Sequence, residues 1–189
     1  ILGASSFAGS FSEISYEVDS VELYIPKMGL YSNSMLRKDL LDSIIDELST
    51  LDLYTSVHAP YFAASPTYPQ DVLVDTANMG DAAFRIMGES IELACRLGSR
   101  VVVLHPGRIN GDREGAFSAM VGNLKVLART AEEYGVMLGL ENKEGTDKGN
   151  LCTGAAELIR AIEEVNSDNM RITFDIGHAN LTCGSNMMK

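Results

Sequence analysis

Residues 101–111, VVVLHPGRING, combine a buried strand with a histidine at its end. Four consecutive apolar residues without polar alternation are typical of a parallel strand that helices cover. Pro106 and Gly107 end this strand directly after His105, because proline cannot donate a hydrogen bond to a sheet. A lone histidine in such a position is usually a structural residue. Its meaning therefore depends on whether other strands of the chain end in the same way.

Short apolar strands alternate with helical stretches over the whole chain. The predicted strands cover residues 1–6, 20–25, 53–57, 100–104, 136–141 and 170–175. Apolar residues recur at helical spacing within 40–51, 117–134 and 158–165, and Gly98 and Gly135 are expected to end helices. Neither a linker nor a low-complexity tract divides the sequence. Residues 1–189 are therefore predicted to form a single α/β domain.

An open doubly wound sheet and a closed (β/α)8 barrel both fit this alternation. A dinucleotide-binding sheet would carry G-x-G-x-x-G after its first strand, where this chain has only Gly3 and Gly9. In a barrel, functional residues gather instead at the carboxyl ends of several strands. We predict the (β/α)8 TIM-barrel type, with the last two βα units lacking in this chain. The first and sixth strands would then have unpaired edges and an exposed apolar flank, which a second subunit, further residues or a rearranged C-terminus would have to cover.

The composition narrows the class of partner. The formal net charge is −11, with 26 acidic and 15 basic residues, and this balance disfavours DNA and anionic membranes as partners. No apolar run reaches the roughly 18 residues of a membrane span. Three scattered cysteines form neither a disulfide framework nor a CxxC zinc motif. These features favour a cytoplasmic protein whose partners are small molecules or metal ions.

Three further strands end in a residue type that binds metals. His58 follows the third predicted strand, Glu141 ends the fifth, and Asp175 ends the sixth, with His178 three positions later. Together with His105 they are expected to meet at one rim, because parallel strands end on the same side of a sheet. Burying these carboxylates and imidazoles unpaired would be costly, and a divalent cation removes that cost. We predict a site for zinc, manganese, cobalt or iron with His58, His105, Glu141 and Asp175 as ligands.

The ordered motifs HAPY (58–61), HPG (105–107), EN (141–142) and DIGH (175–178) resemble those of the xylose isomerase-like TIM-barrel superfamily, which includes sugar isomerases, epimerases and endonuclease IV. The resemblance implies that Glu141 and Asp175 hold the metal shared by both branches. It implies that His178 binds substrate in the isomerases or a further metal in the endonuclease. His58 and His105 match ligands of an additional zinc in the endonuclease. The remaining ligands of that family, on strands seven and eight, lie beyond the last residue.

Three functions follow from this pattern. The first, which we favour, is a metal-dependent isomerase or epimerase of a small sugar-like substrate, in which Glu141 moves a proton next to a carbonyl. His178 and Glu22 are then expected to bind the substrate, because superfamily members often carry a glutamate at the position of Glu22. The second is a zinc-dependent apurinic/apyrimidinic endonuclease, which the two extra histidines favour and the acidity of the chain disfavours. The third is a non-catalytic barrel that binds a metal or a partner.

Overall fold

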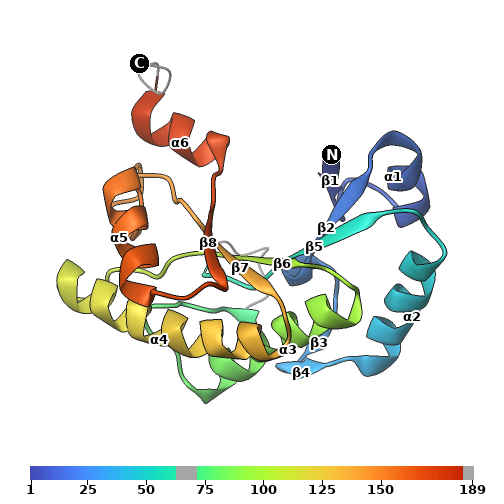
Figure 1. The fold of residues 1–189 in the computed structure, drawn as a ribbon, viewed down its shortest axis with the longest axis horizontal. Coiled ribbons are helices and arrows are strands. Elements are labelled where there is room, and N and C mark those ends of the chain that lie inside the picture. Colours follow the sequence, from blue (N-terminus) through green and yellow to red (C-terminus); the bar gives the residue numbers. More distant parts are fainter. Residues whose placement is uncertain (63–71, 185–189) are drawn as a thin grey trace.

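The computed structural model describes residues 1–62 and 72–184. Its main sheet has six parallel strands that lie side by side in chain order (Figure 1). They are β1 (Gly3–Ser5), β2 (Ser20–Tyr24), β5 (Tyr54–His58), β6 (Val101–Leu104), β7 (Met137–Glu141) and β8 (Met170–Thr173). A short antiparallel pair, β3 (Tyr31–Ser32) and β4 (Met35–Leu36), follows β2 and the 3-10 helix η1 (Ile25–Lys27). The predicted parallel α/β order is confirmed.

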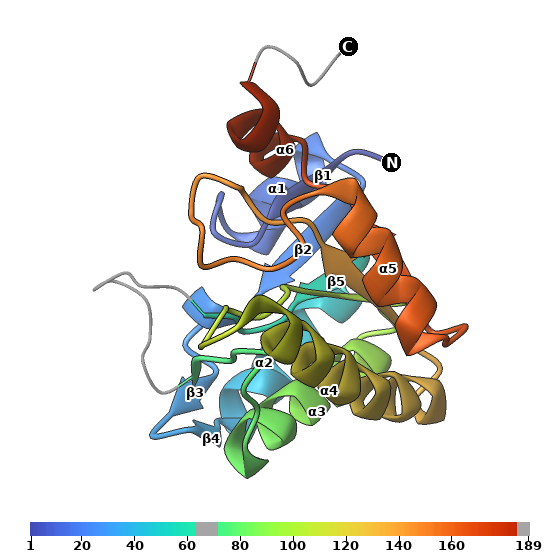
Figure 2. The ribbon, with the colours of Figure 1, turned by 90° about the vertical axis from the view of Figure 1, so that its left-hand side faces the viewer.

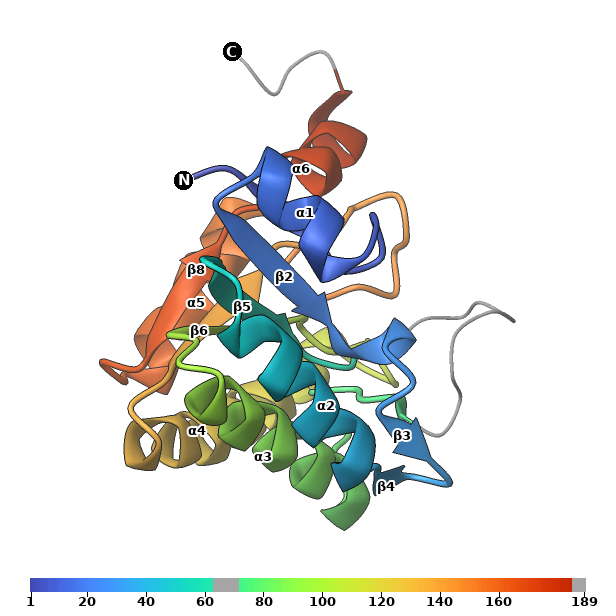
Figure 3. The ribbon, with the colours of Figure 1, turned by 90° about the vertical axis from the view of Figure 1, so that its right-hand side faces the viewer.

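The helices are α1 (Phe11–Glu17), α2 (Lys38–Ser49), α3 (Asp81–Arg96), α4 (Arg113–Glu133), α5 (Ala155–Val165) and α6 (Ile176–Cys183). Helix α3 packs on β5 and β6, α4 on β7 and α5 on β8, as successive crossovers of a barrel do. In all three views α1 and α6 lie near the top of the molecule, and α3 and α4 lie near the bottom (Figures 1, 2 and 3). No described helix is both long and apolar enough to cross a membrane.

Local sequence explains where these helices begin and end. The Asp112 side chain accepts a hydrogen bond of 3.0 Å from the backbone N–H of Gly115 and so caps the amino end of α4. Gly98 and Gly135 have φ of 67° and 66°, the left-handed conformation that ends a helix at low cost. The expected role of both glycines is confirmed. Each one turns the chain into the strand that follows.

Some predicted bounds differ from the structure. Residues 1–2, 6 and 174–175 lie outside β1 and β8, whereas His58 is the last residue of β5 rather than the residue after it. Asp175 is the N-cap of α6, where its side chain accepts a 2.6 Å hydrogen bond from the N–H of His178. An aspartate that bonds a backbone N–H three residues later favours a helix start over a continued strand.

The strand register places the predicted site residues on one face. Tyr24, His58, Val103, Gly139 and Arg171 align across five neighbouring strands. Side chains alternate along a strand, so residues two positions further along share that inner face, and these include His105 and Glu141. The opposite face carries the buried residues Val21, Leu23, Val57, Val102, Leu104, Leu138 and Leu140, which belong to the hydrophobic core. The inner face is thus free to carry polar chemistry at its carboxyl rim.

Within the described residues β1 and β8 each pair with one neighbour only, so the sheet is open at both edges. Apolar side chains beside β8 are correspondingly accessible: Ile172, Phe174, Ile176 and Leu181 are 43% to 63% exposed. The expected open edges with an apolar flank at the β8 side are therefore confirmed. Coverage of this flank by a second subunit stays a prediction.

Candidate metal centre

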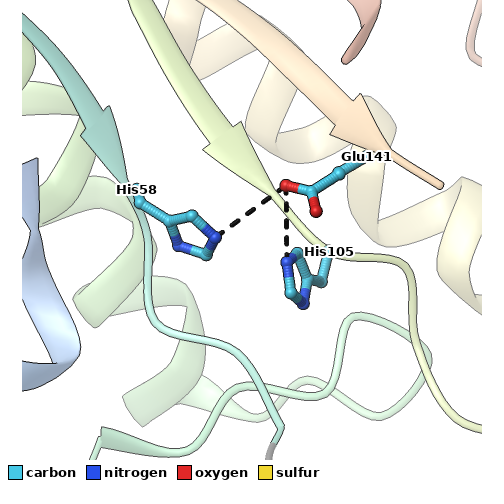
Figure 4. A group of neighbouring side chains, drawn as sticks. All are labelled: His58, His105 and Glu141. Carbon is cyan, nitrogen blue, oxygen red and sulfur yellow. Dashed lines mark ion pairs between the residues drawn. The ribbon is translucent and has the colours of Figure 1, made fainter. Parts of the chain in front are cut away.

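The carboxylate of Glu141 lies at the centre of the site. Its Oε2 is 3.5 Å from Nε2 of His105 and 3.9 Å from Nε2 of His58 (Figure 4). Its Oε1 is 3.1 Å from Nδ1 of His178. The imidazoles come from the end of β5, from the residue after β6 and from the first turns of α6. The structure therefore brings all three histidines of the chain to one buried carboxylate.

Two groups of potential ligands share Glu141. His58, His105 and Glu141 form the first group, and Glu141, Asp175 and His178 form the second; within each group the ligand atoms lie within 4.8 Å of one another. The first group is buried, whereas Asp175 and His178 of the second are partly accessible. A carboxylate that belongs to both groups has one oxygen for each. Each group therefore offers ligands for one ion, and Glu141 would be a ligand in either.

The donor atoms of the first group fit a metal ion. Both ring nitrogens of His105 are buried, and neither has a hydrogen-bond partner among the described residues. Such orphaned buried polar atoms are costly unless something binds them. In His58, Nδ1 lies 2.9 Å from the carbonyl oxygen of Ala59, so the Nδ1–H donates and the Nε2 lone pair faces Glu141. Two imidazoles and one carboxylate are a common ligand set for zinc and related divalent metals.

Burial sets the protonation of these groups. It raises the pKa of Glu141, and the nearby Asp175 carboxylate raises it further, whereas His58 and His178 oppose the shift. Burial also lowers the pKa of His58 and, more strongly, that of His105, whose pKa the neighbouring His58 lowers further. Both imidazoles are therefore neutral at pH 7, which is the form that binds a metal.

Asn142 organises the second group, and the sequence analysis assigned it no role. The side-chain Nδ2–H of Asn142 donates to the backbone carbonyl of Asp175 at 3.0 Å, and the backbone N–H of Asp175 donates to Oδ1 of Asn142 at 2.7 Å. The backbone carbonyl of Asn142 lies 2.8 Å from Nδ1 of His178. One residue thus holds both Asp175 and His178 in place beside Glu141. An amide directly after a strand-ending glutamate was the available signal.

Glu22 lies lower on the inner face of β2 and is partly buried. Burial raises its pKa, and the carboxylates of Glu141 and Asp175 raise it further. The charge of the site therefore affects the pKa of Glu22, although Glu22 belongs to neither ligand group. Its role in substrate binding stays a prediction.

A charged pair borders the second group. Nζ of Lys143 is 2.9 Å from Oε2 of Glu144 and 3.5 Å from Nε2 of His178. Oε2 of Glu144 is also 3.5 Å from Nε2 of His178. The pair combines a hydrogen-bond donor and an acceptor at the partly accessible side of Glu141.

Known proteins share this architecture. A crystal structure of a D-tagatose 3-epimerase-like protein superimposes with a TM-score of 0.74 at 26% identity and covers 94% of this chain and 66% of that chain. A D-psicose 3-epimerase crystallised with D-fructose gives a TM-score of 0.72 at 17% identity, covering 97% of this chain and 66% of its own. The second likeness concerns the fold alone.

Curated sequences add two relatives. A protein of Methanocaldococcus jannaschii without an assigned function is 34% identical over 132 residues, which are 66% of this chain and 41% of that protein. D-psicose 3-epimerase of Enterocloster bolteae is 34% identical over 73 residues, 39% of this chain and 24% of the enzyme. The chain thus spans less than half the length of these curated relatives. The family model described as xylose isomerase-like TIM barrel matches residues 14–188, so the protein belongs to the xylose isomerase-like TIM-barrel family.

Proposed function

We propose that the protein is a metal-dependent isomerase or epimerase of a small sugar or sugar-like substrate. The observation that carries this proposal is the buried carboxylate of Glu141, which two ligand groups share and whose pKa burial raises. A carboxylate with a raised pKa suits the abstraction and return of a proton near neutral pH. The similarity to a D-psicose 3-epimerase and to a D-tagatose 3-epimerase-like protein supports sugars as the substrate class.

Each residue of the site has a separate role in the proposed reaction. A divalent ion held by Glu141, Asp175 and His178 would supply polarisation of the substrate carbonyl and hydroxyl oxygens. Glu141 takes the proton from the carbon next to the carbonyl and, in an isomerisation, delivers it to the former carbonyl carbon. An epimerisation needs a second acid that returns a proton to the same carbon from the opposite face. Nζ of Lys143 donates a hydrogen bond to one substrate oxygen, while Glu144 accepts one from a neighbouring hydroxyl. Because this lysine is already paired with a carboxylate, the site suits a neutral polyol better than a phosphate ester.

Isotope exchange tests this proposal directly. The protein is incubated in D2O with Mn2+, Co2+ or Zn2+ and with D-fructose, D-psicose or D-tagatose, and deuterium next to the carbonyl is followed by NMR. Replacing Glu141 with Gln is expected to reduce exchange by about 10²-fold or more even at saturating metal, because a general base alone often contributes that much. Glu163→Gln, an exposed carboxylate on α5, is the control that leaves exchange unchanged. Full exchange by the Glu141 variant would contradict the assigned role.

A second function has one observation in its favour. The group of His58, His105 and Glu141 offers a further metal position beside that of Glu141, Asp175 and His178. Two adjacent ions suit hydrolysis of a phosphodiester, as at an abasic site in DNA. The same preparations are therefore assayed on duplex DNA with one abasic site, with metal per chain counted by elemental analysis. Strand cleavage at two or more ions per chain, without deuterium uptake into any sugar, would replace the sugar assignment with this one.

A further inference from the structure

The two buried imidazoles of the first ligand group are fixed in different ways. His58 is anchored by the hydrogen bond from its Nδ1 to the carbonyl of Ala59. His105 has no hydrogen bond at either ring nitrogen within the described residues. A metal-binding histidine commonly donates its second ring N–H to a carbonyl or carboxylate, which sets the orientation of the ring. For His105 the surrounding packing has to supply that orientation.

Four rings form a closed cluster around this position. The ring of Tyr61 lies 4.2 Å from that of His105, tilted by 44°. The ring of Tyr24 meets His58 edge-on at 5.0 Å, and the two histidine rings meet edge-on at the same distance. The hydroxyl groups of Tyr24 and Tyr61 are 2.7 Å apart and hydrogen-bonded, which closes the cluster. Tyr24 therefore contacts His58, Tyr61 contacts both histidines, and one hydrogen bond joins the two tyrosines.

The strand register explains why this bond matters. Tyr24 ends β2 and pairs with His58 at the end of β5, so both are held by the sheet. Tyr61 lies three residues beyond the strand, in the segment that follows β5. Its hydroxyl bond to Tyr24 ties this segment to the sheet and keeps its ring against His105. Edge-on and tilted contacts between rings are directional, so they restrict how His105 rotates.

We propose that Tyr24 and Tyr61 are positioning residues that hold the ring of His105 for metal binding through their mutual hydrogen bond. The inference rests on the metal position proposed above for His58, His105 and Glu141, and it adds two residues that do not themselves offer a ligand. Loss of this one neutral hydrogen bond removes no ring, but it loosens the Tyr61 ring against His105. It therefore weakens metal binding between about twofold and tenfold, the range expected for one such bond.

The test compares Tyr24→Phe, Tyr61→Phe and the double variant with the unaltered protein. Tyr54→Phe is the matched control, because Tyr54 is an exposed tyrosine at the amino end of the same strand β5. Affinity for Zn2+ is measured by chelator competition, the visible absorption of bound Co2+ reports ligand geometry, and the melting temperature of the metal-free protein reports stability. Each single variant is expected to lose affinity and to alter the Co2+ spectrum. The loss in the double variant is expected to be smaller than the sum of the two single losses, because both changes remove the same bond.

The outcomes separate this inference from the function on which it rests. Unaltered protein that binds no ion contradicts the metal site and the inference together. Metal-binding protein whose tyrosine variants keep full affinity and an unchanged Co2+ spectrum contradicts the inference alone. An additive loss in the double variant also overturns it, since the two hydroxyls would then act independently. A lower melting temperature of the metal-free variants with unchanged affinity would assign both tyrosines a purely structural role.

Discussion

Replacing Gly139 with alanine is expected to strain the sheet directly below the site. Gly139 lies on the inner face of β7, two residues before Glu141 and opposite Arg171 of β8. A Cβ atom there would lie 2.2 Å from Oγ1 and 3.4 Å from Cβ of Thr173. The first distance is far below any van der Waals contact, so the threonine has to rotate or the two strands have to separate. Overpacking of this kind costs about 1–3 kcal/mol.

That cost corresponds to a fall in melting temperature of roughly 2–12 °C for a chain of this size. Urea denaturation followed by circular dichroism measures the free energy directly. Thr173→Ala removes Oγ1 and leaves a closest approach of 3.4 Å, which is tight but tolerable. The double variant is therefore expected to recover most of the stability, and also the metal affinity, because β7 and β8 lead to Glu141 and Asp175. A Gly139→Ala protein of unchanged stability, or a double variant without recovery, would refute the packing argument.

Three further outcomes are expected. Asn142→Ala removes both side-chain hydrogen bonds to the backbone of Asp175, so denaturation should show a loss of about 1–3 kcal/mol and metal titration a weaker site. Gly107→Ala places a Cβ 2.2 Å from the backbone nitrogen of Ala77, which cannot rotate away, so reduced stability and metal affinity are expected in the same two assays. Burial lowers the pKa of His58 and His105 in the folded metal-free protein, so the unfolded chain takes up protons first as the pH falls. The free energy of unfolding is therefore expected to be highest above the ordinary histidine pKa of about 6.5 and to decrease as the pH falls below that value. Urea titrations between pH 5 and 8 should show this slope, and His105→Gln should flatten it.

The sequence predicted the strands well because their apolar runs leave little choice. Residues 101–104 contain four buried or partly buried apolar side chains in a row and form β6, which ends at Leu104, directly before His105, as expected. Gly98 predicted that a helix precedes it, but the sequence did not indicate where that helix begins. Its buried face combines large residues with the small Ser90 and Ala94, and its N-cap is Gly80, so no capping side chain marked where α3 begins. Small buried residues contribute to helix packing but add little to the hydrophobic periodicity of the sequence.

Asn142 shows a different limit of sequence-based prediction. Its amide bonds the backbone of Asp175, 33 positions later in the chain. Such a role exists only once β7 and β8 are known to be neighbours in a particular register. The pairing of Tyr24 with Tyr61 is hidden for the same reason, because two strand ends have to meet before their hydroxyls can bond.

The convergence on Glu141 needs the shape of the sheet as well as its order. His58 and Glu141 end strands that are separated by β6, so their backbones lie two strand spacings apart, about 9–10 Å. Their side-chain atoms nevertheless approach to 3.9 Å. Side chains lean together in this way on the concave face of a curved sheet, and Gly139, two residues before Glu141, adds no side chain to the crowded inner face. A strand-end pattern therefore identifies the residues of the site, and the curvature of the barrel wall turns them into one centre around a single carboxylate.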